Sequence, residues 1–328
     1  MDAAEAEGHE LSNADAAAAM NQLQAGRICP PEAQSHDLSL LPPEAARSWS
    51  AHGYFVLKGL VPAATCAAMT AASLDLFARA ETGGQSFKGH HLGPDGVIAV
   101  EEAARLDARH AAEQRMSKLF NIHRLSPFRA FASHPAILKA LHAILGPDVS
   151  CFNSQYIFKN PGVWGQPWHQ DSLYYLFDLM PQVGVWLATT RATVENGCLF
   201  VAPGSHVEPI HPVVPDARPG ANFGYLEVVD YDYANAVPVL MEPGDVLVFL
   251  GADVRRGRHD RDLRSHPRKS SQSWRTPLRD RQYLDQPNAL SHRDHLADGV
   301  SVGAVPVSVR RPGAQPVRVR ERGGHAEG

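Results

Sequence analysis

Short apolar segments separated by glycine and proline fill the chain from residue 149 to residue 250, and this spacing restricts the fold more than any other feature. Each segment has the length of a single β-strand, and Pro161-Gly162, Pro203-Gly204 and Pro243-Gly244 provide turns between them. Including one earlier segment, we predict strands at residues 54–57, 151–159, 168–175, 183–190, 197–202, 236–241 and 245–250.

Two helices are predicted before most of these strands. Pro62 begins the first, which extends to about Ala80 with apolar residues at helical spacing. The second begins at His134-Pro135 and ends at Gly146-Pro147. Helices followed by many short strands are typical of an α+β protein in which a β-sandwich or barrel has helices packed on one side.

Three regions are predicted from composition. Residues 1–40 are polar and rich in alanine without apolar periodicity, which predicts a disordered leader. Residues 41–250 form the folded domain, in which the proline-rich segment 207–235 is predicted to be a lid or substrate loop. Residues 251–328 carry 16 Lys and Arg against 9 Asp and Glu, and we predict a poorly ordered basic region there.

Composition also excludes several classes of function. No apolar run is long enough to cross a membrane, no secretory signal is visible, and the four cysteines form no CxxC pair, so we expect a cytoplasmic protein with reduced thiols. Residues 1–250 carry a balance of −11, with 15 basic and 26 acidic residues, and the basic tail holds few aromatic residues. Nucleic-acid binding is therefore disfavoured. The oligomeric state cannot be predicted from the sequence.

One short motif points to metal chemistry. In Trp168-His169-Gln170-Asp171, a strand would turn His169 and Asp171 to the same face, towards the interior of the sandwich. An imidazole and a carboxylate, completed by a distant second imidazole, form the metal site of non-haem Fe(II) oxygenases. The same pair also occurs as a surface hydrogen bond, so these residues alone leave both interpretations open.

The surrounding segments resemble the phytanoyl-CoA dioxygenase family, and the similarity extends over about residues 50–250. The segments that carry it are residues 53–57, 145–148, 156–159, 168–171, 184–187 (Gly184-Val185-Trp186-Leu187), 192–199, 203–206 (Pro203-Gly204-Ser205-His206) and 243–247. The resemblance implies a double-stranded β-helix, or jelly roll, with flanking N-terminal helices. It implies Fe(II), 2-oxoglutarate and O₂, with ascorbate as a possible stimulant, and hydroxylation of a small molecule with release of succinate and CO₂.

The resemblance also implies roles for individual residues. His169 and Asp171 match iron ligands and catalytic residues, and Lys118, Gln155 and Trp186 match the lining of the 2-oxoglutarate pocket. Other interpretations stay open: Lys118 as a solvated helix lysine, Gln155 as a strand residue facing water, and Trp186 as a core residue. The substrate cannot be predicted, because binding loops differ within one fold.

The pattern changes after Pro243-Gly244-Asp245. The family has its second histidine ligand eleven residues after this glycine, where the chain has Arg255, and a guanidinium has no lone pair for a metal. His259, four residues later, is the candidate replacement, and His266 is a second one. Arg268 matches the arginine that pairs with the far carboxylate of 2-oxoglutarate, or it is one of many exposed arginines.

Beyond residue 250 the final core strands of the family are missing, apart from an isolated apolar run at residues 300–309. We therefore hypothesise a changed reading frame, which sequencing of codons 245–265 tests. Three functions remain: an active oxygenase completed by His259 or His266, a catalytically impaired relative without the distal histidine, and a zinc- or manganese-dependent cupin-like enzyme.

Overall fold

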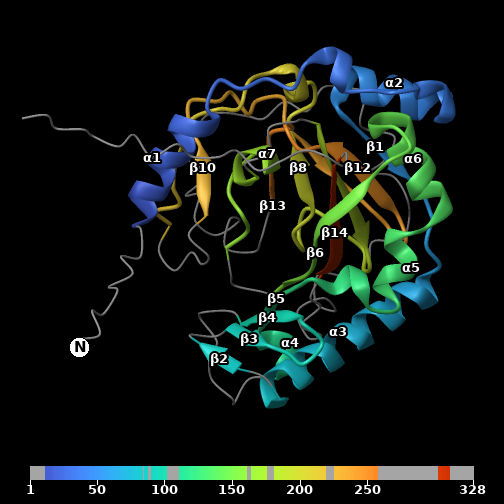
Figure 1. Cartoon of the computed structure of the whole chain (residues 1–328), viewed down its shortest axis with the longest axis vertical. Helices are drawn as coiled ribbons and strands as arrows, with labels where there is room; N and C mark the ends of the chain where they lie inside the picture. The colour runs from blue at the N-terminus through green and yellow to red at the C-terminus, as the bar shows by residue number, and fades with distance from the viewer. Residues whose placement is uncertain are drawn as a thin grey trace, which may run out of the picture.

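The computed structural model describes residues 12–83, 85–87, 90–101, 111–160, 164–175, 181–218, 225–257 and 302–310, the last range for its backbone only. Three antiparallel sheets and several helices make up this part of the chain (Figure 1). None of the described helices is long and apolar enough to cross a membrane.

The largest sheet has nine antiparallel strands in the order β1-β12-β7-β14-β6-β5-β4-β3-β2. Their bounds are β1 Tyr54–Leu57, β2 Gln85–Phe87, β3 His90–Leu92, β4 Ile98–Glu101, β5 Met116–Phe120, β6 Ser150–Lys159, β7 Gln182–Ala188, β12 Val246–Leu250 and β14 Val302–Arg310. The centre of this sheet therefore joins strands that are far apart in the sequence.

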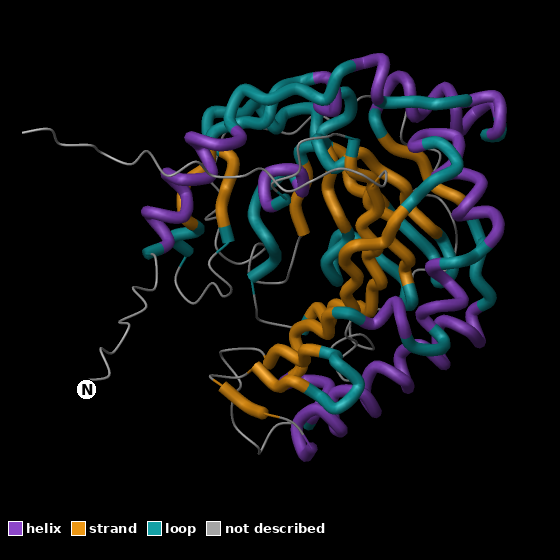
Figure 2. The backbone as a smooth tube through the Cα atoms, viewed as in Figure 1, coloured by secondary structure: helices purple, strands orange, loops and turns teal. Residues whose placement is uncertain are grey.

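Two smaller sheets complete the β-structure. One has the order β11-β8-β13, and the other pairs β10 with β9. Their bounds are β8 Leu199–Val201, β9 Val213–Pro215, β10 Leu226–Val228, β11 Val237–Val239 and β13 Arg255–Gly257. The tube in Figure 2 shows these short strands beside the large sheet, on the side away from most helices.

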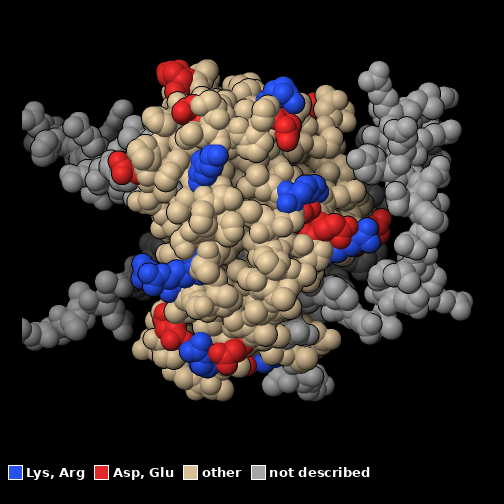
Figure 3. All heavy atoms as spheres, turned by 90° about the vertical axis from the view of Figure 1, so that its right-hand side faces the viewer, with Lys and Arg blue, Asp and Glu red and all other residues tan. Residues whose placement is uncertain are grey.

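Helices α2, α3, α5 and α6 lie along the other side of the large sheet (Figure 1). The helices are α1 Asn13–Gln24, α2 Pro43–His52, α3 Ala63–Gly83, α4 Ala112–Arg115, α5 Phe128–Ala132, α6 Pro135–Leu145 and α7 Asp171–Tyr174, with 3₁₀ turns η1 Pro31–Ala33, η2 Leu38–Leu40, η4 Ile122–Arg124 and η5 Ser205–Val207. On the face that these helices cover, basic and acidic side chains are interspersed rather than gathered into one basic surface (Figure 3).

Alternation along the strands divides the apolar side chains between two cores. In β7, Val185 and Leu187 join the large cluster that includes buried residues of α3 and α6. Trp186 of the same strand joins a second cluster with residues of β8, β11 and β12, among them Phe249. The second cluster therefore fills the space between the large sheet and the β11-β8-β13 sheet, and we call it the inter-sheet core.

Much of the predicted secondary structure is confirmed, including the helices α3 and α6 and the strands β1, β6, β7, β8, β11 and β12. The mixed α and β composition with antiparallel sheets is confirmed as well, and the jelly-roll connectivity stays a prediction. The predicted strand at 168–175 is wrong. His169 forms only an isolated β-bridge, and the chain turns into helix α7 at Asp171.

Two predicted unstructured regions contain structure. Within the predicted leader, Ser12 caps α1 through a capping box with Asp15. The buried side-chain amide of Gln24 donates to the carbonyl oxygens of Ser172 and Tyr175, which ties α1 to the domain. Within the predicted basic tail, residues 302–310 form β14 between β6 and β7. The apolar run near residue 300 is therefore a central strand rather than an isolated segment.

Candidate metal centre and co-substrate pocket

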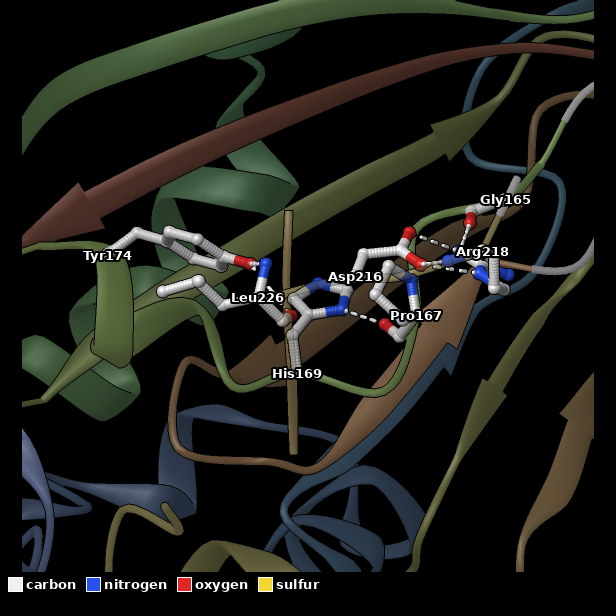
Figure 4. A network of polar contacts seen from close by, with 7 residues as sticks. All are labelled: Gly165, Pro167, His169, Tyr174, Asp216, Arg218 and Leu226. Atoms are coloured by element: carbon white, nitrogen blue, oxygen red, sulfur yellow. Dashed lines mark hydrogen bonds and ion pairs between the residues drawn. The ribbon is translucent and has the colours of Figure 1, made fainter. Parts of the chain in front are cut away.

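His169 presents one ring nitrogen to the interior. Its Nδ1 lies 2.7 Å from the carbonyl oxygen of Pro167 (Figure 4). A carbonyl oxygen can only accept, so Nδ1 carries the proton and donates, and Nε2 keeps its lone pair. Burial, followed by the nearby charge of Arg255, lowers the pKa of His169. The imidazole is therefore neutral at physiological pH and offers a donor atom at Nε2.

Asp171 stands beside this donor. It is the first residue of α7, and its Oδ1 lies 3.6 Å from Nε2 of His169. Burial alone would raise the pKa of Asp171, but the charge of the adjacent Arg255 guanidinium outweighs it and lowers the pKa to about 2. The carboxylate is therefore ionised. The predicted convergence of the pair is present, although it arises from a bridge followed by a helical turn rather than from a strand.

Gln170 explains why the chain turns between the two residues. Its side chain is fully buried, its Nε2 donates to the carbonyl oxygen of Ala252 at 2.7 Å, and its Oε1 accepts from the backbone N–H of His211 at 2.8 Å. These bonds fix the backbone between His169 and Asp171 to two other segments. The role of Gln170 was not predicted, because nothing local in the sequence indicates these distant partners.

Arg255 contacts both members of the pair. Its backbone and that of His169 exchange two hydrogen bonds of 2.8 and 2.9 Å in an antiparallel bridge. Residues paired in this way project their side chains to the same side. The Arg255 guanidinium donates from Nη1 to Nε2 of His169 at 3.1 Å and forms an ion pair through Nη2 with Asp171 Oδ2. It also lies over the ring of Phe249, 4.2 Å from the centroid.

The described residues do not complete an iron site. His169 and Asp171 supply one nitrogen and one carboxylate donor, and the third position belongs to Arg255, which has no lone pair. The described part of the chain contains no group of three or more His, Cys, Asp or Glu side chains that could hold a metal. The predicted ligand His259, its substitute His266, and Arg268 lie outside the described residues.

The three residues predicted to line the 2-oxoglutarate pocket share one face of the large sheet. Lys118 pairs with Ile157, and Ile157 and Ala188 both pair with Ala304 of β14. Cross-strand partners and residues two apart face the same way. Gln155, Trp186 and Lys118 therefore all face the side of the inter-sheet core.

The structure tests the alternative interpretations of these three residues. Lys118 is a buried strand residue, 7% exposed, with its Nζ 4.8 Å from the ring centroid of Tyr225, so a solvated helix lysine is wrong. Gln155 is half-buried, and its Oε1 is buried without a hydrogen-bond partner among the described residues. Trp186 belongs to the inter-sheet core. An orphaned buried acceptor is the mark of a missing partner, such as a bound molecule or water.

Lys159 is a fourth residue on this face, and no role was predicted for it from the sequence. It is buried at the end of β6, its Nζ donates to the carbonyl oxygen of Gly197, and the same Nζ lies 6.0 Å from the Trp186 ring centroid. Its position four residues after Gln155 on one strand could have indicated that it faces the same interior.

The predicted substrate loop is held by polar contacts. Arg218 donates to both carboxylate oxygens of Asp216 and to the carbonyl oxygen of Gly165 (Figure 4). The hydroxyl of Tyr174, in the turn of α7, donates to the carbonyl oxygen of Leu226. Part of the segment 207–235 is thus a two-stranded sheet, β9 with β10, fastened to the turns on either side of His169.

A model of the family described as phytanoyl-CoA dioxygenase matches residues 49–254, which is more than half of the chain. The chain belongs to the phytanoyl-CoA dioxygenase family. The match ends one residue before Arg255, so it includes the His169–Asp171 pair and excludes the residue that contacts both.

Relatives of this phytanoyl-CoA dioxygenase family member include oxygenases from several sources. Dioxygenase lolE1 from Epichloe uncinata is 33% identical over 132 residues, which are 40% of this chain and 48% of that protein. The chain spans about half the length of the first curated relatives it matches. Membership in the family therefore supports an oxygenase, while the reaction of this chain needs its own test.

Solved structures share the fold at low sequence identity. EctD from S. alaskensis, crystallised with 2-oxoglutarate and 5-hydroxyectoine, has a TM-score of 0.54 and 16% identity over 90% of this chain and 85% of that chain. The epimerase SnoN, in complex with Fe³⁺ and alpha-ketoglutarate, has a TM-score of 0.51 and 15% identity over 85% of this chain and 93% of that one. An epimerase among these neighbours indicates that the fold does not fix the reaction.

Proposed function

We propose that this protein is an Fe(II)- and 2-oxoglutarate-dependent dioxygenase that hydroxylates a small molecule and releases succinate and CO₂. The observation that carries the proposal is the His169–Asp171 pair. A neutral imidazole with its lone pair turned inward lies 3.6 Å from an ionised carboxylate in the interior of the fold. Membership in the phytanoyl-CoA dioxygenase family and neighbours crystallised with 2-oxoglutarate or iron support the same reaction class.

In this proposal the residues of the chain have distinct tasks. The carbonyl oxygen of Pro167 holds the His169 ring in the tautomer that leaves Nε2 as donor, and Gln170 keeps Asp171 next to it. Lys118, Gln155 and Trp186 line the space for 2-oxoglutarate. The cation of Lys118 suits a carboxylate, and the Oε1 of Gln155 has no partner among the described residues.

The proposed activity has one requirement. A nitrogen donor from the segment after Gly257 must join the pair, and His259 is the nearest candidate in sequence, with Arg268 as the partner for the far carboxylate of 2-oxoglutarate. The guanidinium of Arg255 must then leave its present contacts. The described residues supply only two of the ligands that an iron ion would need.

Arg255 favours a second candidate function. A family member whose pair holds a guanidinium keeps the fold and the polar interior but does not activate O₂. Such a protein would bind 2-oxoglutarate or another carboxylate without turnover. The ion pair with Asp171 and the hydrogen bond to His169 are the observations that support this candidate.

Metal stoichiometry and uncoupled turnover decide between the two candidates. Anaerobic equilibrium dialysis measures Fe(II) per chain, and succinate formation from 2-oxoglutarate with ascorbate measures turnover without the unknown substrate. The wild type is compared with His259→Ala and with His266→Ala, which removes the second candidate donor. The dioxygenase is expected to bind one iron and form succinate, and to lose both in one of the two variants. Loss in His259→Ala identifies the proposed donor, and loss in His266→Ala identifies the alternative one. If all three proteins bind the same amount of iron, and less than one iron per chain, the dioxygenase is refuted. The second candidate, a protein that binds a carboxylate without turnover, then remains.

A further inference from the structure

We propose that Arg255 is a resident cation that occupies the place of a divalent metal between His169 and Asp171 and competes with metal ions for this pair. The proposal rests on the proposed function only for the choice of metal. Its own basis is the set of contacts that one side chain makes with a nitrogen donor and a carboxylate.

The guanidinium satisfies both metal-type donors at once. Its Nη1 donates to the inward lone pair of His169 Nε2 at 3.1 Å, and its Nη2 forms an ion pair with Asp171. A metal ion would need the same lone pair and the same carboxylate. Metal and guanidinium therefore exclude each other, both by their shared donors and by the repulsion of like charges at short range.

The backbone holds Arg255 in this position. The two bridge hydrogen bonds to His169 fix its main chain, and β13 pairs with β8 on the other side. Arg255 is 7% exposed, and its guanidinium lies over the ring of Phe249. A guanidinium that leaves the pair gives up its ion pair with Asp171 and its hydrogen bond to His169, while its backbone stays held by the bridge. Such a separation is costly, so the cation is not easily displaced by metal.

The neighbour Arg256 provides a matched control. Its guanidinium lies 5.3 Å from the ring centroid of Trp168 and 5.5 Å from that of Phe200. Arg256 carries the same charge as Arg255 and lies on the same strand. Because successive residues of a strand point to opposite faces, its side chain points away from the pair. Loss of its charge changes the net charge of the protein as much as loss of Arg255 does.

Co(II) titration tests the competition, with equilibrium dialysis for affinity and visible absorption for coordination. Arg255→His removes the cation and places a donor opposite His169, so the affinity for Co(II) is expected to rise at least about tenfold, which equals ~1.4 kcal/mol. Arg255→Gln removes only the charge and is expected to give a smaller rise. Arg256→Gln is expected to bind Co(II) as the wild type does.

The outcomes separate this proposal from the proposed function. Urea unfolding first establishes that Arg255→His and Arg255→Gln fold. If both fold and bind Co(II) no more tightly than the wild type, the resident cation is refuted, whatever the iron and succinate assays give. If Arg255→His does not fold, Arg255→Gln decides alone: unchanged affinity refutes the competition. Tight Co(II) binding by Arg255→His, together with a wild type that binds only substoichiometric iron, supports the resident cation and refutes the dioxygenase.

Discussion

Replacing Asp171 by asparagine removes the negative charge that the buried guanidinium of Arg255 is paired with. The pKa of Asp171 falls from 3.8 to about 2 in the folded protein. Since one pKa unit corresponds to ~1.4 kcal/mol, the ionised carboxylate stabilises the fold by about 2 kcal/mol relative to a neutral one. Its side chain is 20% exposed, so solvent screens this interaction only in part. We therefore expect Asp171→Asn to lower the free energy of unfolding by about 2 kcal/mol at pH 7.

Urea unfolding with a metal chelator present measures this loss, and its pH dependence has a definite sign. Because the folded pKa of Asp171 is lowered, its contribution is complete above pH 3.8 and is lost as the pH falls towards 2. The difference between wild type and variant should stay constant from pH 7 to pH 5 and shrink below pH 4. Asp75→Asn, at an exposed ion pair with Arg79, is the control and should cost at most about 0.5 kcal/mol. An Asp171→Asn variant as stable as this control would refute the reasoning.

Three further substitutions test the packing of other parts of the fold by urea unfolding. Asp253→Asn should stabilise the protein at pH 7 and less so near pH 4. Burial raises the pKa of Asp253 well above its usual value, and its carboxylate has no hydrogen-bond partner among the described residues. An acid whose pKa is raised by folding destabilises the folded protein at any pH above the pKa of the unfolded chain, so removing its charge helps most at pH 7. Gly244→Ala should cost about 1–3 kcal/mol or more, because φ is +94° and a Cβ would lie 2.0 Å from the carbonyl oxygen of Val61. Tyr156→Phe should cost about 1 kcal/mol, since the lost hydroxyl is hydrogen-bonded to Thr70 at 2.8 Å.

Local patterns predicted the elements whose signals lie within one segment. Helix α6 begins at Pro135 and ends before Gly146, as the proline and glycine indicated, and the buried run of β12 is a strand. Strand β14 could not be placed in the same way. Its partners β6 and β7 precede it by more than a hundred residues, and pairing over such a separation leaves no local signal.

The candidate site was predictable in part. The spacing of His169 and Asp171 indicated that they converge, although the strand geometry behind that prediction is wrong. The sequence also showed that Arg255 stands where an imidazole was expected. It could not show that the guanidinium bonds to both members of the pair, because that depends on the antiparallel bridge between residues 169 and 255.

Backbone and side chain have separable roles at this bridge. The hydrogen bonds between residues 169 and 255 use only main-chain atoms, and the alternation of Trp186 and Leu187 in β7 builds both cores without reference to residue 255. An arginine and a histidine at position 255 are therefore compatible with the same local backbone. The main-chain bonds of the bridge and the residues of the two cores are sufficient for the fold to resemble that of its relatives. Whether the pair holds a metal ion or a guanidinium depends on the chemistry of one side chain, and for that reason family membership and metal binding require separate experiments.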